Sequence, residues 1–538
     1  MGAWPELALP ASGAYYTNLY APHKRLVQGS PPLEDHRPDH PLIIPRSEHV
    51  ISRSKISPNA LKVLYRLRAA GFRGCLVGGG VRDLLLGREP KDFDVATDAH
   101  PEEVYRLFRN CRLIGRRFRL AHVQYGSEII EVATFRAQTP AEDEDGAGGS
   151  GGVVTDAEGR ILSDNVYGTI EDDAWRRDFT VNALYYDVAD FSVLDYVGGM
   201  DDLKAGVIRL IGDPEQRYRE DPVRMLRAIR FAAKLGMRLH ADTEAPIHTL
   251  GHLLRDIPPA RLFDEVLKLF MAGSGVQTFE LLRLHGLFRH LFPATDRCLS
   301  RELNGFPRTL LVRALASTDE RVAADKSVTP AFLYAALLWE PVRSRYRLLH
   351  DGAASPLEAM QRAADECIER QLGHTALPRR YALPMREIWQ LQPRFEDLNP
   401  RRAARLAAHP RFRAAYDFLL LRAESGEPVS DLAGWWTRWI DGPEATAAAP
   451  ASAPAGRLLD TEASRRAIRE AARQRSTGEM AADASGASAP LGAQERMGQD
   501  IARGARGDCL KGEYAGGGMG LLSLPFWLIA ELREKCRR

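Results

Sequence analysis

The feature that most constrains this chain is a strand that runs through three consecutive glycines into a helix and then into a second strand. The pattern predicts a strand at 74–77, a turn at 78–80, a helix at 81–86 that Gly87 ends, and a strand at 91–96. Strands and helices that alternate this closely indicate a mixed sheet with helices packed on it.

Two aspartates, Asp92 and Asp94, stand two residues apart on the second predicted strand. Side chains alternate along a strand, so both carboxylates project from one face while Phe93 points into the core. Their repulsion is relieved by a hard divalent cation such as Mg²⁺, which keeps substrate phosphates in its shell. The pair is therefore predicted to hold metal for phosphoryl chemistry, and the alternative is two solvated aspartates on an edge strand.

The glycine turn strengthens the metal interpretation. Gly79 and Gly80 let the backbone approach a phosphate closely, and the N-terminus of the following helix favours anions. Arg82 adds a charge-assisted fork for a triphosphate. The spacing matches neither the dinucleotide-binding glycine pattern nor a Walker loop.

A third carboxylate has two candidates. Glu131 lies on a predicted strand at 129–134, and Asp178 lies in a conspicuous motif at 176–183. Either side chain can complete a cluster with Asp92 and Asp94, and spacing alone does not choose between them.

Other local signals predict the surroundings of this segment. Ser57 followed by Pro58 is typical of a helix start, and Gly126 is placed to turn a β-hairpin of residues 120–125 and 127–136. Pro101 begins a predicted helix to residue 110. Residues 142–152 are first acidic and then glycine-rich, which indicates a surface insertion.

The chain has 538 residues and a formal net charge of +2, so nucleic-acid binding requires local basic patches rather than a global field. Arginines gather at 106–119 and again at 401–413. Six scattered cysteines fit a reducing cytoplasm. The apolar stretch 521–530 is too short to cross a bilayer, so no membrane association is expected.

The predicted fold class is α+β: a small mixed-sheet head, an all-α neck and body, and a low-complexity tail. We assign residues 1–50 to an extended arm, 51–205 to the head, 206–275 to the neck, 276–440 to the body and 441–538 to the tail. In the neck, Asp221 and Pro222 are placed to cap and open a helix that ends near Gly236.

Four motifs, at 78–87, 91–95, 176–183 and 219–232, occur in one order and together resemble the class II branch of the polymerase-β nucleotidyltransferase superfamily. That branch holds tRNA CCA-adding enzymes and bacterial poly(A) polymerases. Within it, four further segments resemble bacterial poly(A) polymerase I, namely 114–123, 257–263, 389–392 and 409–417. The resemblance runs from about Ile44 to about Trp439 and covers most of the chain.

The resemblance implies that Asp92, Asp94 and Asp178 are the catalytic carboxylates, which favours Asp178 over Glu131. It also implies that Arg177 and Asn182 lie near the ribose and triphosphate of the incoming nucleotide. The alternative for Arg177 and its neighbour Arg176 is a solvated pair that closes a loop.

In the neck, the resemblance implies that Asp221 and Arg224 present hydrogen-bonding groups to the nucleotide base. Arg227 shares a helix face with Arg224, three residues away. These residues would select the base in place of a nucleic-acid template.

The function implied is polyadenylation of RNA 3′ ends, on mRNA and small RNA, with ATP as substrate and Mg²⁺ as cofactor, in the cytoplasm. One alternative is a tRNA CCA-adding nucleotidyltransferase, and another is a non-catalytic RNA-binding protein on the same scaffold. The tail, 441–538, is expected to contact RNA-decay machinery.

Overall fold

The computed structural model describes residues 40–115, 119–137, 154–155, 161–163, 166–300, 306–352 and 354–442. All of them belong to the first of two units into which the chain divides, 1–449 and 450–538. The predicted insertion at 142–152 and the tail beyond residue 442 lie outside the described residues.

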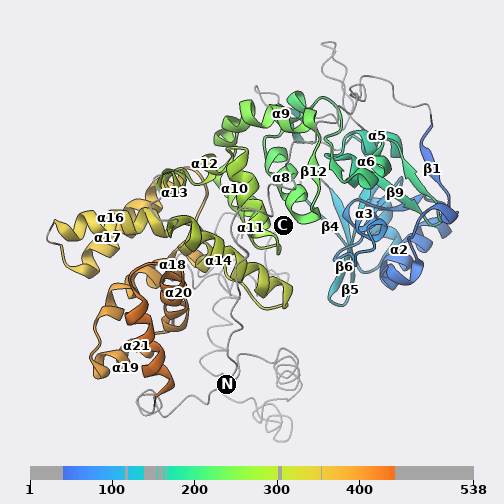
Figure 1. Cartoon of the computed structure of the whole chain (residues 1–538). Coiled ribbons are helices and arrows are strands. Elements are labelled where there is room, and N and C mark those ends of the chain that lie inside the picture. Colours follow the sequence, from blue (N-terminus) through green and yellow to red (C-terminus); the bar gives the residue numbers. More distant parts are fainter. Residues whose placement is uncertain are drawn as a thin grey trace, which may run out of the picture. The chain divides into compact units, whose positions relative to one another are not determined.

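The head is built on a mixed sheet of eight strands in the order β1-β10-β9-β2-β3-β6-β5-β4 (Figure 1). Neighbouring strands run antiparallel except β3 and β6, which run parallel. The strands are β1 Leu42–Ile44, β2 Gly74–Val77, β3 Asp94–Thr97, β4 Cys111–Ile114, β5 Leu120–Tyr125, β6 Glu128–Thr134, β9 Leu184–Asp187 and β10 Val193–Asp195. Two short pairs stand apart from this sheet: β7 Val154–Thr155 with β8 Ile161–Ser163, and β11 Val207–Ile208 with β12 Arg238–Leu239.

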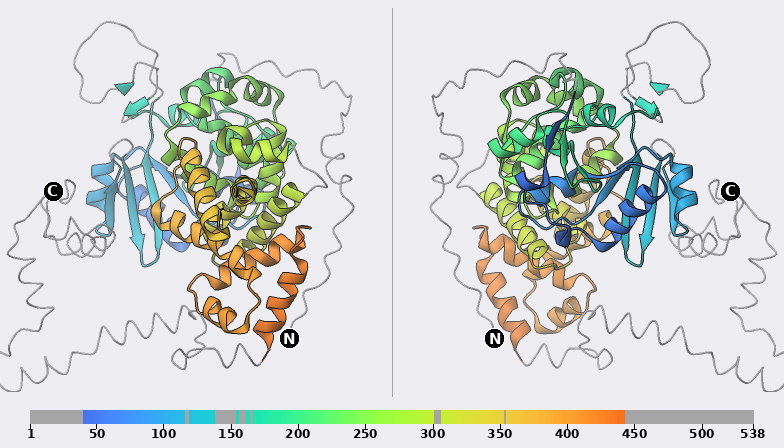
Figure 2. Two further views of the ribbon diagram at one scale, coloured as in Figure 1. Left: turned by 90° about the vertical axis from the view of Figure 1, so that its left-hand side faces the viewer. Right: turned by 90° about the vertical axis from the view of Figure 1, so that its right-hand side faces the viewer.

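Helices follow the strands of the head and then take over the chain. The head carries α2 Pro58–Ala69, α3 Gly79–Leu85, α4 Pro101–Leu107, α5 Ile170–Trp175 and α6 Gly199–Ala205, with short 3₁₀ turns η1 Arg46–Glu48, η2 Arg53–Lys55 and η3 Thr180–Asn182. In Figure 2 the chain from green to orange is almost entirely coiled ribbon. These elements are α7 Pro214–Glu220, α8 Val223–Leu235, α9 Ala241–Leu250, η4 Gly251–Asp256, α10 Pro259–Phe270, α11 Gly275–Leu284, α12 Phe288–Leu291, α13 Pro293–Leu299, α14 Phe306–Ala323, α15 Pro330–Leu337, α16 Trp339–Asp351, α17 Pro356–Leu372, α18 Arg379–Leu391, η5 Pro393–Glu396, α19 Pro400–Ala407, α20 Phe412–Glu424 and α21 Ser430–Asp441.

This layout confirms the α+β fold class, and several local predictions hold. The Ser57 hydroxyl accepts hydrogen bonds from the backbone N–H groups of Asn59 and Ala60 and so caps α2. Gly126, with φ of +64°, turns the hairpin between β5 and β6. Gly236, with φ of +69°, ends α8. Of the described helices, none is long and apolar enough to cross a lipid bilayer.

The predicted strand at 91–96 was wrong at its start, because β3 begins at Asp94. Its neighbour β2 ends at Val77, which pairs with Asp94, and Gly78 then leaves the sheet. Residues before Asp94 therefore have no β2 residue to pair with. Asp92 is exposed ahead of the strand, whereas Phe93 is buried as predicted.

Three further boundaries differ from the sequence analysis. The helix predicted to reach residue 110 ends at Leu107, because Cys111 starts β4 and pairs with β5. Strand β1, within the segment predicted to be an arm, pairs antiparallel with β10. Helix α8 begins at Val223, so Pro222 and not Asp221 stands at its N-cap, although the Asp221 carboxylate still accepts the Val223 N–H at 3.2 Å.

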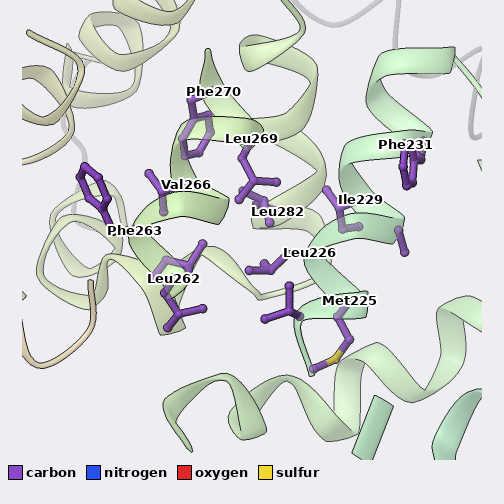
Figure 3. Close-up of a cluster of buried hydrophobic side chains, with 14 of the residues drawn as sticks. Met225, Leu226, Ile229, Phe231, Leu262, Phe263, Val266, Leu269, Phe270 and Leu282 are labelled. Carbon is purple, nitrogen blue, oxygen red and sulfur yellow. The ribbon is translucent and has the colours of Figure 1, made fainter. Parts of the chain in front are cut away.

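Helix α8 is fixed by an apolar cluster in the neck. Figure 3 shows Leu226 and Ile229 of α8 facing Leu262 and Val266 of α10, with Leu282 of α11 beside them. All of these side chains are buried. Burying each contributes about 1.5–3 kcal/mol relative to exposure, so α8 is a rigid support for the polar side chains on its other face.

A substitution at Gly199 tests how tightly the head is packed around η3. A Cβ at this first residue of α6 would overlap the carbonyl oxygen of Thr180. Gly199→Ala is expected to lower the free energy of unfolding by about 1–3 kcal/mol, since backbone atoms must move to admit the methyl group. Urea titration of the full chain measures the loss.

The matched control is Gly434→Ala inside α21, where a Cβ meets only the flexible end of Arg438 at 3.4 Å. Alanine at this helical position is expected to leave stability unchanged or raise it slightly. Equal stability of the two variants would contradict close packing at Gly199.

Candidate active site

The glycine turn brings a cation and a carboxylate against its backbone. Gly78 has φ of +75°, a conformation that favours glycine. A Cβ there would lie 3.7 Å from Nη1 of Arg177 and 3.8 Å from Oδ2 of Asp94. At Gly80 a Cβ would lie 3.3 Å from the carbonyl oxygen of Asp92, so helix α3 starts directly on the segment that carries the aspartates.

Carboxylates gather at the start of β3. Asp94 is half-buried, and in the parallel pairing of β3 with β6 it stands opposite Glu131, so both side chains share a face. Burial and the negative charges of Glu131 and Asp92 raise the pKa of Asp94 to about 6, against the opposing charge of Arg177. A carboxyl group perturbed in this way by burial and like charge is typical of a functional site.

These residues fit a hard divalent cation. The donors are all carboxylate oxygens, and their mutual repulsion is the electrostatic condition that such an ion relieves. Within the described residues, the three-residue group of His, Cys, Asp or Glu whose ligand atoms converge within 4.8 Å lies in the neck and does not include Glu131. That Asp92 and Asp94 hold the metal stays a prediction, and Glu131 is a neighbouring charge on the same face of the sheet.

Arg177 is held in place by a buried acid that the sequence analysis missed. The side chain of Asp173 is 1% exposed and accepts from Arg176 at 2.7 Å, from Arg177 at 2.8 Å and from the Tyr185 hydroxyl at 2.7 Å. Although burial acts to raise it, the pKa of Asp173 is held well below its usual range by Arg177 and Arg176. The arginine pair is thus no solvated loop closure. Its sequence signal was an acid three and four residues ahead of two arginines on one helical turn.

Asp178 belongs to a second network. Its Oδ2 accepts from Nε of Arg227 at 2.8 Å, and its Oδ1 accepts from the Phe179 N–H and, at 3.3 Å, from Asn182. Although burial acts to raise it, the pKa of Asp178 is lowered by the Arg227 guanidinium. The prediction that Asp178 acts with the aspartate pair stays a prediction, since the carboxylate is engaged with α8.

Arg82 lies in the same network and not at the surface. It is 2% exposed, donates to Asn182 at 2.6 Å and to Asp83 at 2.7 Å, and lies 5.4 Å from the centre of the Phe231 ring. The predicted direct fork on a triphosphate is untested. In this structure Arg82 joins α3 to η3 and to α8.

The N-terminal turn of α8 carries the predicted base-reading residues, and each has a partner. Arg224 donates to Glu220 at 2.8 Å, and Asp221 accepts from Arg261 at 2.7 Å. Arg217 reaches back to the carbonyl oxygens of the Arg176–Arg177 pair at 2.8 and 2.7 Å. The sequence analysis missed Arg217, Glu220 and Arg261. Arg217 and Arg261 have partners about 40 residues away, whereas Glu220 stands four residues before Arg224.

The basic zones are partly neutralised by local acids. Arg119 pairs with Glu102 in the first zone. In the second zone the pairs are Arg402 with Asp397, Arg411 with Glu387 and Arg413 with Asp417.

Models of three protein-family domains match the chain in order: "Poly A polymerase head domain" at 75–209, "Probable RNA and SrmB- binding site of polymerase A" at 236–299 and "Polymerase A arginine-rich C-terminus" at 352–475. Poly(A) polymerase I of Salmonella typhi is 51% identical over 403 residues, which is 74% of this chain and 86% of the relative. The chain belongs to the bacterial poly(A) polymerase I family.

Three further proteins complete the comparison. Poly(A) polymerase I of Escherichia coli O157:H7 is 52% identical over 397 residues, 73% of this chain and 84% of the relative. A CCA-adding enzyme of Lactobacillus helveticus is 37% identical over 224 residues, 41% of this chain and 52% of that relative. A solved structure of the Bacillus stearothermophilus CCA-adding enzyme with CTP shows 26% identity and a TM-score of 0.48, over 71% of this chain and 81% of that one.

Asp173→Asn tests the buried charge cluster. The substitution leaves Arg176 and Arg177 without their shared carboxylate and is expected to cost about 3–5 kcal/mol of stability at neutral pH. The folded-state pKa of Asp173 is depressed, so its contribution is complete above the unfolded value of about 3.9 and is lost as pH falls towards the folded value. Urea titrations of both proteins at several pH values measure the difference.

The stability gap between wild type and Asp173→Asn is therefore expected to narrow below about pH 4. A gap that stays constant from neutral to acid pH would show that the charge of Asp173 is not what stabilises the arginine pair.

Proposed function

We propose that this chain carries out template-independent polyadenylation of RNA 3′ ends with Asp92 and Asp94 at the reacting centre. One observation carries the assignment: a half-buried carboxylate with a raised pKa lies against a glycine turn and beside the half-buried guanidinium of Arg177. Such an arrangement offers a carboxylate to a divalent cation and a guanidinium to a phosphate, which are the two charged parts of a metal–triphosphate.

The reaction is a displacement at the α-phosphorus of ATP. The 3′ hydroxyl oxygen of the RNA forms the new phosphorus–oxygen bond, and the bond to the bridging oxygen of the β-phosphate breaks. Pyrophosphate leaves, the hydroxyl proton passes to solvent, and the RNA is one adenylate longer with a new 3′ hydroxyl.

Divalent metal use is implied by the family, and we propose Mg²⁺ as the ion held by Asp92 and Asp94. When bound, such an ion supplies positive charge that lowers the pKa of the attacking hydroxyl and offsets the charge of the leaving pyrophosphate. The all-oxygen donor set favours Mg²⁺ over softer metals.

The protein's own residues orient the nucleotide. Arg177, fixed by Asp173, offers charge to the triphosphate beside Asp94, and the backbone of Gly79 and Gly80 admits phosphate closely. Asn182 and Arg82 support Asp178, which in turn fixes Arg227 on the helix that reads the base. This places Asp178 as a positioning residue in our proposal.

Base selection is assigned to Asp221 and Arg224. Both stand at the start of α8, and their side chains are held by Arg261 and Glu220. A hydrogen-bonding edge held by its neighbours discriminates between bases with little loss of side-chain entropy.

CCA addition is the nearest alternative, because a CCA-adding enzyme is 37% identical over 41% of this chain. Polyadenylation is favoured, since the poly(A) polymerase relatives are more similar and are matched over most of both chains. The non-catalytic alternative is disfavoured by membership of an enzyme family and by the presence of both aspartates.

Family membership supports RNA and a nucleotide as partners. We propose that these are mRNA or small-RNA 3′ ends and ATP, that the chain acts in the cytoplasm, where both are found, and that the tail at 441–538 contacts RNA-decay machinery.

Removing either metal carboxylate tests the proposed centre. Asp92→Ala and Asp94→Ala are each expected to slow AMP incorporation by at least about a thousandfold, the equivalent of several kcal/mol of charge stabilisation. Incorporation of label from ATP into a short RNA measures the rate. Asp201→Ala, at an aspartate of α6 whose side chain is 83% exposed, is the control and keeps the wild-type rate. Near-normal incorporation by both test variants would refute the assignment.

The roles of Glu131 and Asp178 separate in a Mg²⁺ titration. Glu131→Gln removes a charge opposite Asp94 and is expected to raise the half-saturating Mg²⁺ concentration by about tenfold or more. Asp178→Asn releases Arg227 and is expected to raise the KM for ATP while the Mg²⁺ requirement stays unchanged. The reverse pattern would make Asp178 the third metal-facing carboxylate.

A further inference from the structure

A second cluster of metal-ligating side chains lies in the neck, away from the aspartate pair. Glu244 and His248 stand four residues apart on α9, so they share one face of that helix. His285 follows the last residue of α11. One ligand atom from each of the three side chains lies within 4.8 Å of the others, and this is the group of this kind found among the residues that the structure describes.

His285 is the unusual member of this cluster. Its side chain is 1% exposed, and neither ring nitrogen has a hydrogen-bond partner. The nearest acidic oxygen, Oε1 of Glu244, lies 3.7 Å from Nδ1, which is beyond hydrogen-bond distance. A buried polar group without a partner is unfavourable, so an occupant that satisfies the imidazole would stabilise the folded chain.

The neighbouring imidazole points to the kind of occupant. The rings of His248 and His285 have centroids 5.4 Å apart and are tilted by 45°, so they are not stacked face to face. His248 is exposed and Glu244 is 34% exposed. Because neither side chain is enclosed, both have room to adjust towards the ligand distances of about 2.0–2.2 Å that zinc requires.

We propose that Glu244, His248 and His285 form a site for Zn²⁺, with water in the remaining position. Two imidazole nitrogens and one carboxylate oxygen are ligands that suit zinc and not Mg²⁺, which requires oxygen donors. The open side towards solvent leaves room for the water. The site is independent of the reacting centre assigned above.

Such an ion joins α9 to the end of α11. Helix α11 packs against α8 in the apolar cluster of Figure 3, and α8 carries Arg224 and Arg227. The bound ion therefore stabilises the support of the base-reading helix, and it takes no part in phosphoryl transfer.

The test uses the full chain after removal of metals by a chelator, which is then dialysed away. Co²⁺ is added in the presence of excess Mg²⁺, which occupies the carboxylate pair. The expected result is visible absorption typical of four-coordinate Co²⁺ with nitrogen ligands, which saturates at one equivalent and is abolished by one equivalent of Zn²⁺. The melting temperature is expected to rise with Zn²⁺, because the ion binds the folded state.

The matched variants are His248→Gln and His252→Gln, two exposed histidines on consecutive turns. His248→Gln is expected to weaken Co²⁺ binding by more than about tenfold, whereas His252→Gln, whose Nδ1 contacts the Thr249 carbonyl oxygen, binds as wild type. Equal melting temperatures without metal show that His248→Gln is folded. Absence of the absorption band, or equal binding by the two variants, would overturn the proposal.

Discussion

Repulsion among the carboxylates of Asp92, Asp94 and Glu131 is the constraint on which the head depends. The parallel pairing of β3 with β6 sets Asp94 opposite Glu131, and the pKa of Asp94 rises to about 6 through burial and these charges. Arg177 offsets part of the repulsion, but only because the buried Asp173 fixes its guanidinium. Because Gly78 has no side chain, Arg177 and Asp94 can both lie close to the backbone of the glycine turn. A cation held with a triphosphate completes the charge balance, so substrate binding and metal binding are expected to be cooperative.

Ion pairs and hydrogen bonds connect the carboxylate site of the head to the helices of the neck. Asp178 holds Arg227, Asn182 and Arg82 tie η3 to α3, and Arg217 holds the backbone of the arginine pair. The apolar face of α8 is packed against α10 and α11, so its polar face has little freedom to move. The residues assigned to phosphate and to base are therefore parts of one connected structure, which preorganises the site.

Sequence patterns predicted what depends on local periodicity and turn chemistry. The Ser57 cap, the Gly126 hairpin and the fold class follow from such signals, and the motifs identified the family. The start of β3 could not be predicted from such signals, because it is set by the residue at which β2 ends. The burial of Arg82 could not be predicted either, because its partner Asn182 is distant in the sequence. The role of Asp173 was missed although Arg176 and Arg177 stand three and four residues after it, because nothing local shows that this acid is buried against Tyr185. The roles within the site were predicted only through the resemblance, and the choice between Glu131 and Asp178 depends on a register that no local pattern encodes.

The central claim is that this arrangement adds adenylate, and the product ladder tests it most directly. The full chain is incubated with a tRNA that lacks its CCA end, with Mg²⁺ and with ATP or CTP offered separately and together. The account predicts long tails from ATP alone and no extension that requires CTP. A product that stops at a completed CCA end and needs CTP would contradict it.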